Sequence, residues 1–372
     1  MAQDETARTL RRRTLLAAMA GSAALLAPRG LRAEPSTPFA ERFRDLIKAA
    51  QAEGQVTWYQ GSLEAAGRDF SVLFEKRFGI KVSHIFGIGS PAFERFRSEA
   101  RAGKTIGDLF NATDGTLMYD LLKEGLISDY RTATADDFPE GWVMKAGNGV
   151  AYPTSRTQMV FMWNTQSVPP AKAKLLSQWK GLLDPSFGGG RMGLGDATRS
   201  GGVFAAYYYL LRVNPQQYGL PFLKELAKQQ PVLFAAHTEM GAQIASGALD
   251  MGVTFDPVSL QQYELGTPVG YSFPDPTPAL LLLTGIARTA PHPNAARLLM
   301  EYLTSAEGMV EWGNLYRAGL GRPDMDAKIA QRVVREPWFA PPPKNYVIID
   351  WEAAARDHDA IIREWSSVFK PA

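Results

Sequence analysis

Hydrophobic positions along the chain form short apolar runs that alternate with amphipathic segments, and glycine separates many of them. Residues 41–54 have the spacing of an amphipathic helix that ends at Gly54, a residue type that often terminates helices. The run 56–59 is β-branched and aromatic, which predicts a buried strand. Because strand, short polar loop and helix then repeat, the pattern predicts βα units joined in a parallel sheet.

The same pattern locates the remaining elements. The predicted strands are 56–59, 80–85, 108–111, 191–195 and 251–255, and the predicted helices are 41–54, 69–78, 91–102, 203–212, 222–228 and 351–369. Two further segments, 148–164 and 267–287, are rich in β-formers, and we interpret them as extended crossings between two groups of βα units. The sequence therefore predicts two α/β lobes with a cleft between them.

The length of 372 residues suits two or three domains. Lobe 1 is expected to comprise residues 34–155 together with about 275–335, and lobe 2 residues 156–274. Residues 336–372 form a C-terminal helical segment in this interpretation. Ligands of such folds gather at the loops that follow the carboxyl ends of the strands.

The N-terminus has the features of an export signal. Three arginines, Arg11 to Arg13, precede the apolar run 15–26, which is too short to span a bilayer. This order predicts a signal peptide of the twin-arginine kind, cleaved near Ala33, and a periplasmic mature protein that begins after residue 33. An N-terminal membrane anchor is the alternative.

Charge and composition exclude several classes of function. The chain has 40 basic and 38 acidic residues. Residues 1–33 contain six arginines and two acidic residues, so their removal leaves 34 basic and 36 acidic residues in the mature protein. This balance argues against a nucleic-acid partner. Cysteine is absent, which rules out disulfides, thiolate metal sites and cysteine nucleophiles. The four histidines lie far apart in sequence and no GxSxG elbow occurs, so we predict no catalytic residues, no metal site and no cofactor.

The strongest candidate for a binding site is the segment DATRSGG at 196–202, which joins a predicted strand to a predicted helix. Thr198 and Ser200 are favourable helix-capping types, and Gly201 and Gly202 permit a close approach of the backbone. Free N–H groups and the positive end of the helix dipole, with Arg199 in the same loop, would form an anion site. A helix cap without a ligand is the simpler alternative.

Other polar residues also lie in loops that follow predicted strands or in the first crossing. Ser62, Ser90, Thr113 and Asp114 follow strands of the first lobe, and Ser155 and Arg156 lie in the first crossing. The arginine offers a planar donor fork that suits a carboxylate or phosphate. If these residues share one rim of the cleft, they predict a site for a small anion.

These segments together resemble a known family. They are WYQGSLEAA (58–66), FGIKVSHIFGIGS (78–90), GDLFNATDGTLMYDLLKEGLI (107–127), GLGDATRSGG (193–202), HTEMGAQIASGALDMGVTFDP (237–257) and SAEGMVEWGNLYRAGL (305–320). Their order and spacing resemble the extracellular solute-binding proteins of ABC importers, in particular the group that includes the periplasmic ferric-ion-binding proteins. The resemblance implies a type II periplasmic binding protein fold, an α/β fold whose lobes each contain a mostly parallel sheet flanked by helices. It further implies a monomeric receptor without enzymatic activity, which closes on a ligand and delivers it to ABC permease subunits.

The resemblance also implies which residues line the cleft. They are Ser62, Ser90, Thr113, Ser155, Thr198 to Gly202, His237, and Phe255 with Asp256. Ferric-binding members carry adjacent tyrosines where this chain has Pro257 and Val258, and often a histidine where it has Leu63. Because ferric iron prefers phenolate and carboxylate oxygens, a small organic anion (a phosphonate, or a phosphorylated or carboxylated metabolite) is the favoured ligand.

Three alternatives remain open at this stage. Iron binding is the first, since Thr113, Asp114 and Asp256 could supply oxygens to a metal. A secreted α/β hydrolase or transferase is the second. A receptor that presents its ligand to a membrane sensor is the third, and it would share the fold of a transport receptor.

Overall fold

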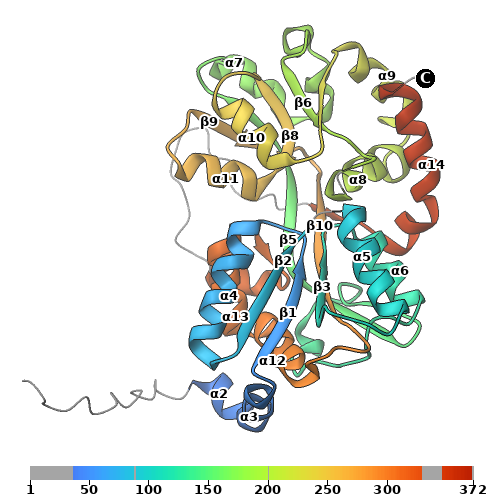
Figure 1. Ribbon diagram of the computed structural model, residues 1–372. Coiled ribbons are helices and arrows are strands. Elements are labelled where there is room, and N and C mark those ends of the chain that lie inside the picture. Colours follow the sequence, from blue (N-terminus) through green and yellow to red (C-terminus); the bar gives the residue numbers. More distant parts are fainter. Residues whose placement is uncertain (1–36, 88, 200, 329–345, 371–372) are drawn as a thin grey trace, which may run out of the picture. The chain divides into compact units, whose positions relative to one another are not determined.

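The computed structural model describes residues 37–87, 89–199, 201–328 and 346–370 (Figure 1). The predicted signal peptide, 1–33, lies outside the described residues. The chain divides into two compact units, Met1–Glu41 and Arg42–Ala372. Helix α2 (Pro38–Arg42) is the first described element, and all the elements below belong to the second unit.

The first half of the sheet is built from the predicted βα units. Its strands are β1 (Gln55–Gln60), β2 (Lys81–Phe86), β3 (Leu109–Ala112) and β10 (Thr277–Ile286), and its helices are α3 (Arg44–Glu53), α4 (Glu64–Phe78), α5 (Gly89–Arg101), α6 (Gly115–Lys123), α12 (Pro293–Thr304) and α13 (Ala306–Tyr316). Strands β2 and β3 flank β1 in parallel, and β10 pairs antiparallel with β3. Gly54 and Gly79 end α3 and α4 at φ values of 73° and 70°, the left-handed conformation that favours glycine.

Strand β5 (Gly149–Asn164) connects the two halves of the sheet. Its residues 152–158 pair antiparallel with β10, and its residues 159–164 pair antiparallel with β8 and β9. In the described part of the chain the continuous strand order is β2-β1-β3-β10-β5-β8-β6-β7. The first predicted crossing is therefore confirmed as a single long strand, and the second contains β9 and β10.

The second half of the sheet has its own parallel core. Its strands are β6 (Met192–Gly195), β7 (Val232–Phe234), β8 (Met251–Phe255) and β9 (Val269–Ser272), and its helices are α7 (Pro170–Ala173), α8 (Gly201–Tyr208), α9 (Gly219–Lys228), α10 (His237–Ala245) and α11 (Asp256–Glu264). Strand β6 lies between β7 and β8 and is parallel to both. Buried side chains such as Met162, Met240 and Tyr271 pack into one cluster beneath α10 and α11.

Aromatic rings form the core of the first half. Trp58 of β1 lies 5.6 Å from Trp312 and 6.1 Å from Phe70 between ring centroids. Phe70 also contacts Tyr302 at 6.0 Å. All four side chains are almost completely buried, so α4, α12 and α13 are held to the sheet by large apolar contacts.

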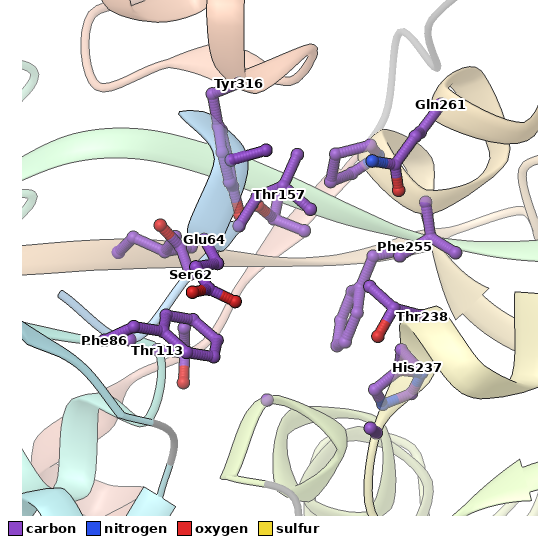
Figure 2. A pocket seen from close by; sticks show the side chains of 18 of the residues that line it. Ser62, Glu64, Phe86, Thr113, Thr157, His237, Thr238, Phe255, Gln261 and Tyr316 are labelled. Carbon is purple, nitrogen blue, oxygen red and sulfur yellow. The ribbon is translucent and has the colours of Figure 1, made fainter. Parts of the chain in front are cut away.

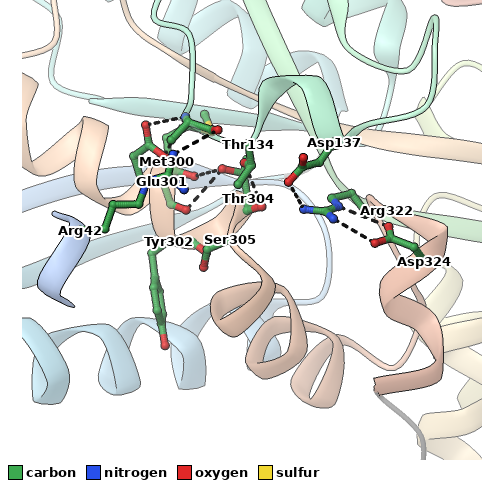
Figure 3. Close-up of polar contacts among 11 residues, drawn as sticks. Arg42, Thr134, Asp137, Met300, Glu301, Tyr302, Thr304, Ser305, Arg322 and Asp324 are labelled. Atoms are coloured by element: carbon green, nitrogen blue, oxygen red, sulfur yellow. Dashed lines mark hydrogen bonds and ion pairs between the residues drawn. The ribbon is translucent and has the colours of Figure 1, made fainter. Parts of the chain in front are cut away.

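A buried carboxylate ties the loop at 130–134 to α12, and Figure 3 shows Glu301 of α12 close to Thr134 of this loop. Glu301 accepts hydrogen bonds from the hydroxyl of Tyr130 at 2.8 Å and from the backbone N–H of Ala133 at 3.1 Å. Burial raises the pKa of Glu301. Nearby, Arg322 forms ion pairs with Asp137 at 2.7 Å and Asp324 at 2.9 Å.

The C-terminal helix α14 (Trp351–Phe369) has the bounds that its amphipathic pattern predicts. It follows the short strand β12 (Tyr346–Ile348) and packs against α6 in the first half and against α8 and α9 in the second (Figure 1). Arg212 forms ion pairs with Asp357 at 3.2 Å and with Glu364 at 2.6 Å. The helix is thus fixed to both halves.

The structure contains more helical residues than the sequence pattern predicts. Helix α4 begins at Glu64, five residues before the predicted start, and α6, α10, α11, α12 and α13 were not assigned from periodicity. The remaining short strands of the described ranges are β4 (Met144–Ala146) and β11 (Gly319–Leu320), which both pair with β5. No helix in the described ranges is both long enough and apolar enough to cross a membrane.

Candidate functional site

A cavity of about 470 Å³ lies where loops of the two sheet halves face each other (Figure 2). It is lined by Gly61, Ser62, Leu63, Glu64, Ala65, Phe86, Thr113, Thr157, Gly202, Ala235, Ala236, His237, Thr238, Phe255, Pro257, Val258, Gln261, Leu280, Leu282 and Tyr316. The volume is within the usual range for small-molecule sites. Side chains from both halves would therefore contact the same bound molecule.

The wall of the first half is formed by loops that follow parallel strands. Ser62 and Glu64 come after β1, Phe86 ends β2, and Thr113 follows β3. The amide of Gln60 donates a hydrogen bond to the Ser62 hydroxyl. Parallel alignment brings the carboxyl ends of these strands to one edge, and this is why residues far apart in sequence share the wall.

The opposite wall consists of the first turns of α10 and α11 with the loops before them. His237, Thr238, Phe255 and Gln261 face the first wall across the cavity in Figure 2. The rings of His237 and Phe255 lie 4.5 Å apart between centroids. Gly202, in the first turn of α8, completes this wall, and an added Cβ there would lie 2.9 Å from the Phe255 ring.

His237 is a buried polar side chain of this wall whose ring nitrogens have no hydrogen-bond partner among the described residues. It is 9% exposed, and neither ring nitrogen forms a hydrogen bond with another described residue. Burial lowers the pKa of His237 to about 4, so the ring is neutral at physiological pH. A neutral imidazole offers one donor and one acceptor, and a bound molecule could use either.

Three helix N-termini at the cavity lack a capping side chain. The residues at the N-cap positions of α4, α10 and α11 are Leu63, Ala236 and Phe255, and none of them forms a side-chain capping hydrogen bond. N–H groups of a first helical turn have no partner within the helix, and the helix dipole makes them favourable for negative charge. The cavity is consequently suited to an anionic group held by backbone N–H donors.

The innermost polar contact of the site joins β5 to α13. The hydroxyls of Thr157 and Tyr316 lie 3.1 Å apart, and the Tyr316 ring stacks on Trp312 at 5.3 Å. Burial raises the pKa of Tyr316, so its hydroxyl stays protonated. The apolar side chains of Leu280 and Leu282 lie beside this contact as further lining residues.

Five of the residues predicted for the site line the cavity: Ser62, Thr113, Gly202, His237 and Phe255. Ser200 lies outside the described residues, and so do the side chain of Ser90 and the surroundings of Gly201. The structure thus brings together residues from the strand ends of both halves. Of the loop 196–202, Gly202 is the described residue that lines the cavity.

Other predicted residues have structural partners elsewhere. Asp114 is buried and caps α6 by accepting hydrogen bonds from the N–H and hydroxyl of Thr116. Asp256 accepts a hydrogen bond from the backbone N–H of Gln158 at 3.0 Å. Ser155 accepts one from the indole N–H of Trp312 at 2.5 Å. None of these three acceptors belongs to the cavity lining of the described chain.

Arg156 does not line the cavity either. Its guanidinium stacks over the rings of Tyr346 at 4.8 Å and Trp142 at 5.9 Å, and it donates to the carbonyl of Leu320 at 3.4 Å. Successive residues of a strand point to opposite faces, so Thr157 reaches the cavity while Arg156 points away from it. From the sequence, we expect Arg156 on the same rim of the cleft as the loop 196–202. The position of its guanidinium does not support this expectation.

Two polar residues of that loop, Asp196 and Thr198, bind Lys370 at the end of the C-terminal helix instead. Asp196 accepts hydrogen bonds from Thr198 at 2.9 Å and from the ammonium of Lys370 at 2.7 Å. Thr198 and Arg199 are exposed and lie outside the cavity lining. Burial opposes ionisation of Asp196, but the bonds from Lys370 and Thr198 outweigh it and lower the pKa of the carboxyl.

Sequence reasoning missed six polar or aromatic lining residues: Glu64, Phe86, Thr157, Thr238, Gln261 and Tyr316. The sequence contains a signal for two of them. Glu64 lies two residues after Ser62, Thr238 lies directly after His237, and both occupy the first turn of a helix. In the described residues no group of three His, Asp or Glu side chains could hold a metal ion. Tyr316 is the one tyrosine that lines the described cavity.

Comparisons with known proteins agree with this architecture. Residues 56–310 match the family model described as bacterial extracellular solute-binding protein. Similar solved structures include iron-bound HitA from Pseudomonas aeruginosa, which is 17% identical with a TM-score of 0.68 and covers 84% of this chain and 99% of that one.

Two further structures contain organic ligands. AfuA from Actinobacillus pleuropneumoniae, with fructose-6-phosphate bound, is 18% identical with a TM-score of 0.68, covering 86% of this chain and all of that one. AgtB from A. tumefaciens R10, in complex with agropinic acid, is 19% identical with a TM-score of 0.64, covering 85% and 98%. These likenesses show the two-lobed periplasmic binding protein fold, and the family match extends over most of the chain. The chain belongs to the bacterial extracellular solute-binding proteins, the family that delivers ligands to ABC permeases.

Proposed function

We propose that the protein binds a small organic anion in this cavity and delivers it to the permease of an ABC importer. The class comprises phosphonates and phosphorylated or carboxylated metabolites. The observation that carries the proposal is the convergence of uncapped helix N-termini on the cavity, next to the unpartnered ring of His237. Such N-termini bind anions without any cationic side chain.

The arrangement of the walls favours binding by closure of the two halves. One wall follows strands of the first half and the other consists of first turns of α10 and α11, so a ligand reaches all its donors only between them. Changing the ratio of open to closed protein from 99:1 to 1:99 requires a ligand that prefers the closed form by about 5.5 kcal/mol. Two charge-assisted hydrogen bonds of about 3 kcal/mol each, or three of about 2 kcal/mol each, supply that amount.

Ligands of similar structures support the same class. A sugar phosphate and an organic acid are bound in two of the three proteins described above. HitA is iron-bound, but the lining of this cavity offers one carboxylate, Glu64, and one phenol, Tyr316, and Tyr316 is held by Thr157. This donor set suits ferric iron poorly.

A thermal-shift screen of phosphate esters, phosphonates and carboxylates tests the proposal. An anion present at about 100 times its dissociation constant should add about 2.7 kcal/mol to the free energy of unfolding. Small-angle scattering of the same complex should show a smaller radius of gyration than the free protein. A titration with ferric citrate is the counter-test, and the proposal fails if a visible phenolate-to-iron band grows to one equivalent while no organic anion stabilises the protein.

A further inference from the structure

The two walls of the cavity differ in charge. Of the described lining residues, Glu64 carries the one formal charge, because no lysine or arginine lines the cavity and His237 is neutral. Glu64 is the first residue of α4 and is exposed. Its carboxylate interacts electrostatically with the His84 ring but forms no hydrogen bond or ion pair with another residue of the described part of the chain. Figure 2 shows it on the wall with Ser62 and Thr113.

The opposite wall contributes no charged side chain to the described lining. It presents the uncapped first turns of α10 and α11, whose N–H groups carry partial positive charge, together with the ring of His237, which has no hydrogen-bond partner among the described residues. The acidic residues of these two turns, Glu239 and Asp256, lie outside the lining. A bound molecule that spans the cavity therefore meets the full negative charge of Glu64, beside the uncapped first turn of α4, on the first wall, and uncapped first turns without a carboxylate in the lining on the second.

A ligand with negative charge alone would satisfy one wall only. Closure around it would remove water from the Glu64 carboxylate, and a desolvated carboxylate is unfavourable unless a cation or a hydrogen-bond donor pairs with it. No lysine or arginine of the described lining can pair with Glu64, so an ammonium group of the bound molecule is the cation that would reach it inside the cavity. Phe86, which is 36% exposed, lies on the same wall, and an aromatic face stabilises an ammonium group at close range.

We infer that the solute is a zwitterion, an organic anion that also carries a protonated amine, with the amine bound at Glu64 and the anionic group at the first turns of α10 and α11. The inference rests on the proposed function and makes its ligand class narrower. Ser62 and Thr113 lie beside Glu64 and their hydroxyl oxygens can accept from the same ammonium. The amine thus provides the selectivity of the first wall.

Matched pairs of compounds test this inference by calorimetric titration of the full chain. Suitable pairs are 2-aminoethyl phosphate with ethyl phosphate, 3-aminopropylphosphonate with propylphosphonate, and 4-aminobutyrate with butyrate. In the pair that binds, the amine-bearing member should bind about tenfold or more tightly, the loss expected when a charge-assisted bond is absent. Glu64→Gln should abolish that advantage, and Glu64→Lys should reverse it by favouring the member without the amine.

Glu75→Gln is the matched control, because Glu75 is exposed on the same helix α4 and does not line the cavity. It should leave both affinities unchanged. The inference is overturned if the two members of each binding pair bind equally to the wild type, or if Glu64→Gln retains the preference for the amine. Those results leave the proposed function intact, whereas the absence of binding by every member would contradict the proposed function as well.

Discussion

The buried ring of His237 predicts a specific dependence of stability on pH. Its pKa is lowered to about 4 by burial, with no charged neighbour among the causes, and a histidine of the unfolded chain titrates near 6.5. Between these values the unfolded state binds a proton that the folded state does not. The free energy of unfolding therefore falls as the pH is lowered from about 6.5 to about 4.

The magnitude follows from the size of the shift. A difference of about 2.5 units at 1.36 kcal/mol per unit gives about 3 kcal/mol, fully present above the pKa of the unfolded chain and lost below that of the folded protein. Carboxylates titrate in the same range, so the absolute curve of the wild type does not isolate this contribution. The difference between the wild type and His237→Gln does, because glutamine is uncharged at every pH and the carboxylates are common to both.

Urea unfolding followed by tryptophan fluorescence, repeated in half-unit steps of pH, measures this difference. The stability of the wild type relative to His237→Gln should fall by about 3 kcal/mol between about pH 6.5 and pH 4. Thr238→Val is the control, since it alters the neighbouring cavity residue without removing a titrating group, and its curve should run parallel to that of the wild type. Parallel curves for His237→Gln as well would refute the reasoning and would mean that the ring is solvated or paired in solution.

Two further changes test other contacts. Arg156→Ala should reduce the free energy of unfolding by about 1–3 kcal/mol, because the stack on Trp142 and Tyr346 is lost. It should change the affinity for an anion by less than about twofold. A tenfold or larger loss of affinity in calorimetric titration would place the guanidinium at the ligand. Gly115→Ala should destabilise by about 1–3 kcal/mol in urea unfolding, because its Cβ would lie 2.3 Å from the Trp351 ring at the start of α14, and an unchanged midpoint would contradict this packing.

Local signals in the sequence determined much of the fold. The helix stops at Gly54 and Gly79 are single-residue effects, since the left-handed φ at each favours glycine in any context. The strand–loop–helix rhythm predicted the α/β class, and the 3.6-residue period predicted α14 with its observed bounds. Ser62 and Thr113 could be placed at one edge because parallel strands end there.

Which side chain enters the cavity was decided by tertiary structure. Strand β5 is buried on both faces, so the alternation that distinguishes Thr157 from Arg156 leaves no hydrophobic pattern in the sequence. Likewise, the sequence around Glu64 indicates only an acidic residue in the first turn of a helix. Its position in the cavity depends on the wall that faces it, which is formed mainly by residues 236–261. Contacts between segments almost two hundred residues apart depend on how the two halves pack, and no local pattern of the chain records that packing.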